Sequence, residues 1–315
     1  MNNLHCLAIV PRGALLLALY FFAVGSSHGA TQHDSDIEAF CLDRDGSRKE
    51  VATVATRLAQ VPALLRAPPR ISKPPILLWH GFGPPMNERA LMEALPLDDV
   101  PALKVYLGLP QFGAREAPGG RENMLRNQQE DLGRLVFEPV VVGAARELPS
   151  VIAALQQLSC LRAREKVGLF GFSAGGASVL FALAEGNVPV EAAVIVNPST
   201  GLTASVQAYE RVMKQEYKWT DYTRDLARRT DAVQRAADIA RNHPALLILH
   251  GSDDGMLASN NVVALRDALA PLYKSPRDES RLRVQLVDGL AHGWADSPHA
   301  AEVRRSIADW FNRTS

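Results

Sequence analysis

From residue 76 onward, short apolar runs rich in Leu, Val and Ile alternate with longer segments of helical periodicity. The apolar runs, which predict strands, span 76–79, 103–107, 167–170, 192–196, 246–249 and 282–287. Helices are expected between them, for example over 87–95, 174–185, 260–270 and 299–311. Because the runs do not alternate with polar residues, we expect strands buried on both faces, as in a parallel sheet covered by helices on both sides. The pattern predicts an α/β fold with a mostly parallel central sheet.

Three stretches depart from this simple alternation. Residues 51–58 and the proline-rich stretch up to residue 75 predict peripheral strands. Residues 127–160 predict two or more helices divided at Pro139 and Pro149, since proline lacks the N–H donor that a helix interior needs.

The third stretch, residues 202–241, is amphipathic and charged. Its aromatic residues are Tyr209, Tyr217, Trp219 and Tyr222. We interpret it as a small helical cap whose aromatic cluster forms part of a substrate pocket. A set of ordinary amphipathic helices packed on the edge of the sheet would have the same pattern.

The first thirty residues differ from the rest of the chain. Arg12 precedes an apolar run over 14–24, and small residues follow it. This order is typical of a secretory signal peptide, so residues 1–30 are predicted to be removed and 31–315 to form a single domain. The alternative is an uncleaved anchor, because residues 4–10 are also apolar. With cleavage we expect a periplasmic or secreted protein with no stable membrane insertion.

Composition narrows the classes of function. The 315 residues include 34 Lys and Arg and 34 Asp and Glu, which gives a formal net charge of zero, and 47% are hydrophobic. These values are typical of a soluble globular protein, and the balanced charge argues against a nucleic-acid partner. The spacing of cysteines and histidines does not resemble a metal site, so no metal or cofactor is expected. Cleavage would leave Cys41 and Cys160, which could form a disulfide or stay as two buried thiols. Oligomeric state is not indicated.

The strongest chemical signal lies at residues 167–176, Val-Gly-Leu-Phe-Gly-Phe-Ser-Ala-Gly-Gly. An apolar strand leads into G-x-S-x-G, and an alanine-rich helical segment follows. A serine on such a sharp strand-to-helix turn projects above the sheet, and small residues on either side allow the close approach of strand and helix. The positive end of the helix lies beside the serine oxygen. Ser173 is therefore a candidate nucleophile.

With this motif, the chain resembles the α/β-hydrolases, nearest to the dienelactone hydrolase and prolyl-oligopeptidase-like esterase branch. The resemblance covers about residues 76–311. It includes H-G-x-G at 80–83, the P-x-x-G-x-R loop at 110–115 and, more weakly, Glu147-Leu148-Pro149. It implies an α/β-hydrolase fold whose catalytic serine, acid and histidine follow one another in that order along the chain.

This order selects the base. The histidines beyond Ser173 are His243, His250, His292 and His299. Only His292 is expected in a loop after the final strand, within Gly-Leu-Ala-His-Gly-Trp, where the resemblance implies the catalytic histidine. His292 is therefore the predicted general base.

The resemblance places the acid in the loop after the strand at 246–249, which reads His-Gly-Ser-Asp-Asp-Gly. Three residues after the glycine stands Asp254, the predicted acid, with Asp253 as the alternative. One of the two aspartates could instead hold the turn by bonding its own backbone.

The H-G-x-G loop implies an oxyanion hole formed by the backbone N–H groups of Phe82 and Ala174. His80 is expected to hold this loop by hydrogen bonds and not to transfer protons. Together these residues predict a serine hydrolase that cleaves small-molecule carboxylic esters through an acyl-enzyme. A peptidase or a lactone or polyester hydrolase on the same three residues, and a catalytically silent binding protein, are the alternatives.

Overall fold

A single eight-stranded sheet forms the centre of the computed structural model, which describes residues 32–43, 46, 48–275 and 279–314. The predicted leader lies outside these residues. The strands are β1 (Ala52–Leu58), β2 (Val61–Ala67), β3 (Ile76–Trp79), β4 (Lys104–Leu107), β5 (Val167–Phe172), β6 (Val190–Val196), β7 (Ala245–Gly251) and β8 (Leu282–Val287). Their order across the sheet is β1-β2-β4-β3-β5-β6-β7-β8.

The strands from β4 to β8 are parallel, and only β1 and β2 pair antiparallel to their neighbours. The predicted mostly parallel sheet and the two peripheral strands are therefore confirmed. One detail differs, because β8 is partly exposed along most of its length. It is the edge strand of the sheet, so one side of its backbone has no neighbouring strand to cover it.

The helices are α1 (Gln32–Leu42), α2 (Glu88–Ala94), α3 (Gly120–Asp131), α4 (Gly143–Gln157), α5 (Ala174–Glu185), α6 (Leu202–Met213), α7 (Asp221–Thr230), α8 (Ala236–Ala240), α9 (Ser259–Leu269) and α10 (Ala300–Thr314). A π-helix, η2 (Leu132–Val142), joins α3 to α4. Short 3₁₀ turns span Gly113–Arg115, Ala270–Tyr273 and Glu279–Arg281. Among the described helices, none has the length and apolar character to cross a membrane.

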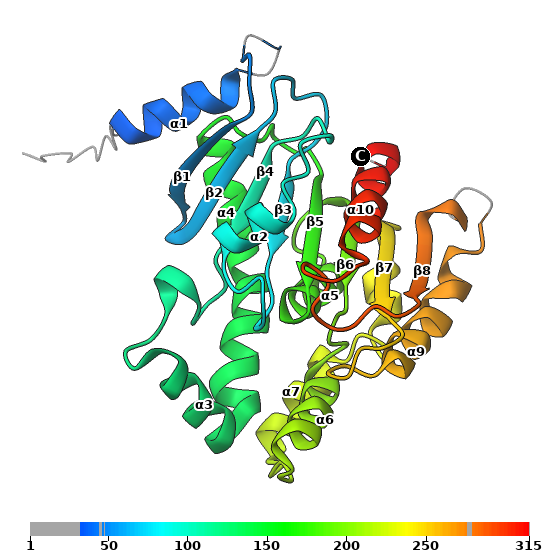
Figure 1. Cartoon of the computed structure of the whole chain (residues 1–315). Coiled ribbons are helices and arrows are strands. Elements are labelled where there is room, and N and C mark those ends of the chain that lie inside the picture. The colour runs from blue at the N-terminus through cyan, green and yellow to red at the C-terminus, as the bar shows by residue number, and fades with distance from the viewer. Residues whose placement is uncertain (1–31, 44–45, 47, 276–278, 315) are drawn as a thin grey trace, which may run out of the picture.

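Two apolar cores lie on opposite faces of the sheet. Side chains alternate along β3, so that Leu77 and Trp79 belong to one core and Ile76 and Leu78 to the other. The first core also contains the buried faces of α4, α5 and α9, and the second those of α2 and α10. Figure 1 shows α2 and α10 on the near side of the sheet and α4 on the far side. Helices thus cover both faces, as the non-alternating strands predicted.

The predicted breaks at Pro139 and Pro149 are wrong, because both prolines lie inside helical segments. Pro139 falls in η2, whose wider turns accommodate a residue without an N–H donor. The side-chain amide of Gln111 donates to the carbonyl of Leu135, four residues before Pro139, at 2.9 Å.

Pro149 lies within α4, whose buried side includes Leu148, Val151, Ile152 and Leu155. Burial of each such side chain stabilises the fold by about 1.5–3 kcal/mol. The sum exceeds the roughly 3 kcal/mol that a proline costs in a helix interior. Packing of the apolar side therefore keeps the helix intact.

Two further features lie at the ends of the molecule. A disulfide between Cys41 and Cys160 joins α1 to the turn after α4. Residues 202–241 form α6, α7 and α8, and Figure 1 shows α6 and α7 beyond the end of the sheet, on the same side as α3.

Candidate active site

Ser173 occupies the turn between β5 and α5 in a conformation that few non-glycine residues adopt. Its φ is 54° and its ψ is −114°. The two flanking glycines are required by close approach: a Cβ on Gly171 would lie 2.2 Å from the carbonyl oxygen of Gly175, and one on Gly175 would lie 2.4 Å from that of His80. The predicted strand–serine–helix turn is present, and its serine is largely buried at 8% exposure.

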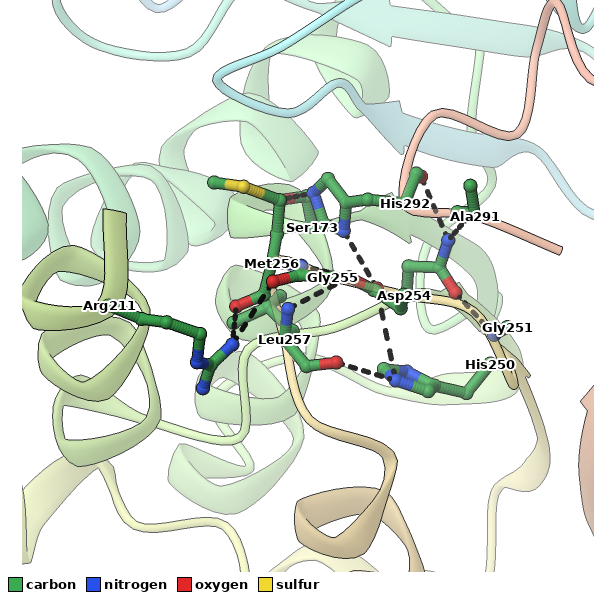
Figure 2. A network of polar contacts seen from close by, with 11 residues as sticks. Ser173, Arg211, His250, Gly251, Asp254, Gly255, Met256, Leu257, Ala291 and His292 are labelled. Atoms are coloured by element: carbon green, nitrogen blue, oxygen red, sulfur yellow. Dashed lines mark hydrogen bonds and ion pairs between the residues drawn. The ribbon is translucent and has the colours of Figure 1, made fainter. Parts of the chain in front are cut away.

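Ser173, His292 and Asp254 form one line of hydrogen bonds (Figure 2). His292 Nδ1 lies 2.8 Å from Asp254 Oδ2, and its Nε2 lies 3.0 Å from Ser173 Oγ. A carboxylate oxygen only accepts, so Nδ1 carries the proton and Nε2 is left to accept from the serine hydroxyl. This tautomer is the one a general base needs.

The geometry selects Asp254 over Asp253. The carboxylate of Asp253 accepts from the neighbouring Ser252 hydroxyl at 2.8 Å. Asp254 has a fully buried side chain and also accepts from the N–H groups of Met256 and Leu257, both at 2.8 Å. Burial by itself would raise the pKa of Asp254, but the hydrogen bond and charge of His292 and the Leu257 N–H lower it below its ordinary value. Asp254 is thus held as a carboxylate.

His250 is a second buried histidine beside this acid. Its Nε2 donates to the carbonyl of Leu257 at 3.0 Å, and this bond closes the loop that contains Asp254 (Figure 2). The same Nε2 lies 3.8 Å from Asp254 Oδ2. Burial lowers the pKa of His250. Its Nδ1 has no hydrogen-bond partner among the described residues. His250 therefore acts as a neutral ring that shapes the acid loop.

Asn197, which the sequence reasoning did not identify, connects the acid and base loops. It is fully buried, directly follows β6 and has a φ of 45°. Its amide nitrogen donates to the carbonyls of Ala291 and His292 at 3.0 and 2.8 Å, and its amide oxygen accepts from the Gly251 N–H at 2.8 Å. One side chain thus sets the distance between the two loops. The only available signal was an Asn-Pro pair immediately after an apolar strand.

The loop after β3 passes directly beside the nucleophile. A Cβ on Gly81 would lie 2.9 Å from the Ser173 Cβ. Phe82 and Ala174 both line the cavity above Ser173. Within the described part of the chain, neither of their backbone N–H groups has an acceptor in the protein. Both predicted oxyanion donors are therefore close to the nucleophile and free to bind an oxygen.

His80 holds the peptide plane on which one of these donors lies. Its Nδ1 donates to the carbonyl of Gly81 at 2.8 Å, and its Nε2 accepts from the Leu109 N–H at 3.2 Å. The Gly81 carbonyl and the Phe82 N–H belong to the same planar peptide group, so fixing one orients the other. Burial lowers the pKa of His80 to about 4, which keeps the ring neutral and its Nε2 free to accept.

The loop that positions His80 is itself anchored. Arg115 donates to both carboxylate oxygens of Glu147, with the Nη1 contact at 2.9 Å, and to the Gly108 carbonyl at 3.1 Å. The P-x-x-G-x-R and Glu-Leu-Pro motifs therefore meet. Through the Gly108 carbonyl and the neighbouring Leu109 N–H, they help to hold His80 and the oxyanion loop in place.

A cavity of about 460 Å³ opens above Ser173. Its walls come from the oxyanion loop, η2, α6 and the acid loop, including Leu132, Phe137, Tyr209, Val212 and Met213. No Asp, Glu, Lys or Arg of the described chain lines it. The described residues also contain no group of three or more metal-binding side chains. The arrangement provides an activated hydroxyl, a base and two N–H donors at the bottom of an apolar cavity, which are the parts needed for acyl transfer.

Comparisons with known proteins agree with this geometry. Residues 144–315 match the model of the prolyl oligopeptidase family. No curated protein sequence in the comparison matches the chain.

Among solved structures, TT1662 from Thermus thermophilus has a TM-score of 0.61 at 21% identity, over 83% of this chain and 98% of that one. An esterase/lipase from an uncultured bacterium has a TM-score of 0.51 at 16% identity, over 92% of both chains. The acylaminoacyl peptidase of Pyrococcus horikoshii has a TM-score of 0.60 at 15% identity, over 85% of this chain. This chain covers only 42% of that peptidase. These likenesses establish the α/β-hydrolase fold.

Proposed function

The chain belongs to the prolyl oligopeptidase family of serine hydrolases, and on this premise we propose that it hydrolyses carboxylic esters of small molecules through an acyl-enzyme. The observation that carries the proposal is the continuous line of hydrogen bonds from Asp254 through His292 to Ser173 at the bottom of an apolar cavity.

In the first step, Ser173 Oγ attacks the ester carbonyl as His292 Nε2 takes its proton. Asp254 keeps the imidazole in the required tautomer and stabilises the imidazolium. The N–H groups of Phe82 and Ala174 bind the oxyanion of the tetrahedral intermediate. The bond from the carbonyl carbon to the alcohol oxygen then breaks, His292 returns the proton to the departing alcohol, and the acyl group stays on Ser173.

In the second step, water takes the place of the alcohol. His292 accepts a proton from the water as its oxygen bonds to the acyl carbon. The ester bond to Ser173 breaks, and the proton passes from His292 to the serine oxygen. The acid is released and the enzyme regains its starting state.

The lining of the cavity favours an ester over a peptide. A peptidase that binds a free peptide terminus needs a charged partner for it, because a buried unpaired charge is costly. Within the described chain, no acidic or basic side chain lines the cavity. An ester without formal charge makes no such demand.

We also propose that the protein acts in the periplasm or outside the cell. The leader-like segment at residues 1–30 and the disulfide between Cys41 and Cys160 support this, since disulfides persist mainly in oxidising compartments. Cell fractionation with immunodetection would test it. Recovery in the cytoplasmic fraction, with both thiols reactive toward a maleimide, would contradict it.

The decisive experiment treats the purified protein with a fluorophosphonate probe and then compares turnover of activated esters with that of peptide anilides. We expect labelling that is lost in Ser173→Ala, together with hydrolysis of esters but not of anilides. Labelling with anilide cleavage alone would identify a peptidase. Well-folded protein without labelling or turnover would identify a silent binding protein.

A further inference from the structure

We propose that the cavity binds an uncharged, apolar acyl group of intermediate length, and that α6 is the wall that selects it. This inference rests on the proposed ester hydrolase function and names the substrate class of that same site. The cavity volume of about 460 Å³ lies at the lower end of the range of small-molecule sites, which is about 300–1,000 Å³. A single acetyl group would leave most of it unfilled.

The wall facing Ser173 is mainly apolar, and the hydroxyls of its two serines, Ser199 and Ser205, are hydrogen-bonded to each other at 2.8 Å. α6 contributes Ala208, Tyr209, Val212 and Met213, and these residues recur at the spacing of one helical face. A second part of the lining is formed by Leu132 and Phe137 of η2, together with other apolar residues. A flexible hydrocarbon chain attached to the acyl carbon would contact side chains of both walls.

Charged groups next to this wall are bonded elsewhere. Arg211 of α6 donates to the carbonyls of Gly255 and Met256 at 3.1 and 3.0 Å (Figure 2). Glu210 accepts from the backbone N–H of Tyr217 at 2.9 Å. A carboxylate or ammonium group at the end of an acyl chain would meet no charged side chain among the described residues that line the cavity, and it would lose its water.

The apolar character continues to the mouth of the cavity. Val212 and Met256, which both line it, are 52% and 41% exposed. An apolar chain that leaves the cavity on this side would cover part of both side chains. The two residues extend the path of the chain from Ser173 to solvent.

The wall is also fixed relative to the reacting groups. The carbonyls that accept from Arg211 belong to Gly255 and Met256, and the Met256 N–H donates to Asp254. α6 is thus tied to the loop that holds the catalytic acid. An acyl chain that packs well on α6 holds the ester carbonyl at the right distance and angle from Ser173 Oγ, whereas a poorly fitting chain does not.

The test measures kcat/KM for p-nitrophenyl acetate, butyrate, hexanoate and octanoate, and for the hexanoyl-length ester whose chain ends in a carboxylate. Each added methylene is expected to raise kcat/KM by about fourfold until the cavity is filled. The carboxylate-ended ester is expected to react at least tenfold more slowly than hexanoate. A maximum at acetate, or equal rates for the charged and uncharged esters, would overturn the inference.

Variants locate the effect on α6. Ala208→Phe fills the cavity and should lower the ratio of octanoate to acetate kcat/KM at least tenfold. Gln207→Phe is the matched control, because Gln207 neighbours Ala208 but lines a separate small cavity. An unchanged ratio in Ala208→Phe, or an equal fall in the control, would show that α6 does not select the chain.

Val212→Arg provides a second variant at an exposed position, where folding is not at risk. It should lower hexanoate turnover and raise that of the carboxylate-ended ester, so that the preference reverses. Loss of both activities equally would contradict the inference. If wild-type protein labels with fluorophosphonate but cleaves no ester of the series, the proposed function fails instead, so the two failures are distinguishable.

Discussion

Two regions of the molecule form the site in different ways. The reacting groups lie at or just after the carboxyl ends of parallel strands: Ser173 after β5, Asp254 after β7, His292 after β8 and Phe82 after β3. The cavity wall comes from helical segments, η2 and α6, that meet at the end of the sheet. In a parallel sheet the carboxyl ends converge on one edge, so topology alone brings the first set together.

The difference concerns what holds each region in place. Around the reacting groups, buried polar side chains such as Asn197, His80 and His250 fix the loops by several hydrogen bonds each. The wall is held by apolar packing and by contacts at its margin, such as that of Arg211. Hydrogen bonds give the chemistry its geometry, and packing gives the cavity its volume. We therefore expect changes in the first region to alter kcat, and changes in the second to alter substrate choice.

The largest effect is expected for His292→Ala. Loss of the base should lower kcat for an activated ester by about 10⁶-fold, the magnitude known for a serine protease triad. His299→Ala is the matched control, because His299 lies in the same C-terminal region and its Nδ1 lies 3.7 Å from the Glu302 carboxylate. Stopped assays at high enzyme concentration would measure both. A fall of less than tenfold in His292→Ala would exclude it as the base.

The second-largest effect is expected for Asn197→Ala. It should lower kcat about 10²-fold at nearly unchanged KM, because a 1 Å misplacement of a reacting group costs about that much. Steady-state kinetics over a range of pH would measure it, since a merely structural defect would not change the pH profile. Asn197→Asp keeps the acceptor for Gly251 but sets a carboxylate oxygen against the carbonyls of Ala291 and His292, so its kcat is expected to fall at least as far. Equal kcat in wild type and Asn197→Ala would show that the acid and base loops keep their positions without the bonds of Asn197.

His80 should make the fold sensitive to acid. Its pKa is about 4 in the folded protein against an ordinary value of 6.5, so below pH 6.5 the unfolded chain binds the proton first. Stability therefore falls as pH drops from 6.5 to 4, by about 3 kcal/mol from this group. His80→Asn retains a donor near Nδ1 and should lack this part of the loss. Urea unfolding at pH 7 and pH 4.5 would measure it, and equal losses in both proteins would contradict the assignment.

The smallest effect is expected for Arg211→Gln at the margin of the cavity wall. Its two bonds are solvent-exposed, so their loss should lower kcat/KM for octanoate by only about three- to tenfold. Acetate, which barely contacts α6, should be less affected. Arg228→Gln on α7 removes a surface ion pair with Asp225 and serves as control. A larger effect on acetate than on octanoate would show that Arg211 acts through Asp254 and not through the wall.

The sequence was sufficient to predict the α/β class, most of the strands and the serine turn. These features depend on local patterns, because apolar runs determine which strands are buried and G-x-S-x-G determines a turn. The resemblance to the α/β-hydrolases, with the chain order that it implies, also predicted His292 as the base and Phe82 and Ala174 as the two donors. In the structure, His292 Nε2 lies 3.0 Å from Ser173 Oγ, and Phe82 and Ala174 line the same cavity as Ser173.

Other features needed the folded molecule. Asp254 was the predicted acid with Asp253 as the alternative, and the two are adjacent and chemically identical; the contact with His292 and the backbone bonds of Asp254 decide between them. Pro139 and Pro149 were predicted to end helices, but burial of the surrounding apolar residues outweighs the lost hydrogen bonds.

Asn197, His250 and the wall formed by η2 and α6 had no decisive local pattern. Their roles come from partners 54 to 95 residues away for Asn197, and from the meeting of two helical segments for the wall. Local chemistry determines which residues can react. The distances between loops, the choice between equivalent side chains and the shape of the cavity depend on long-range packing, which no short stretch of the chain contains.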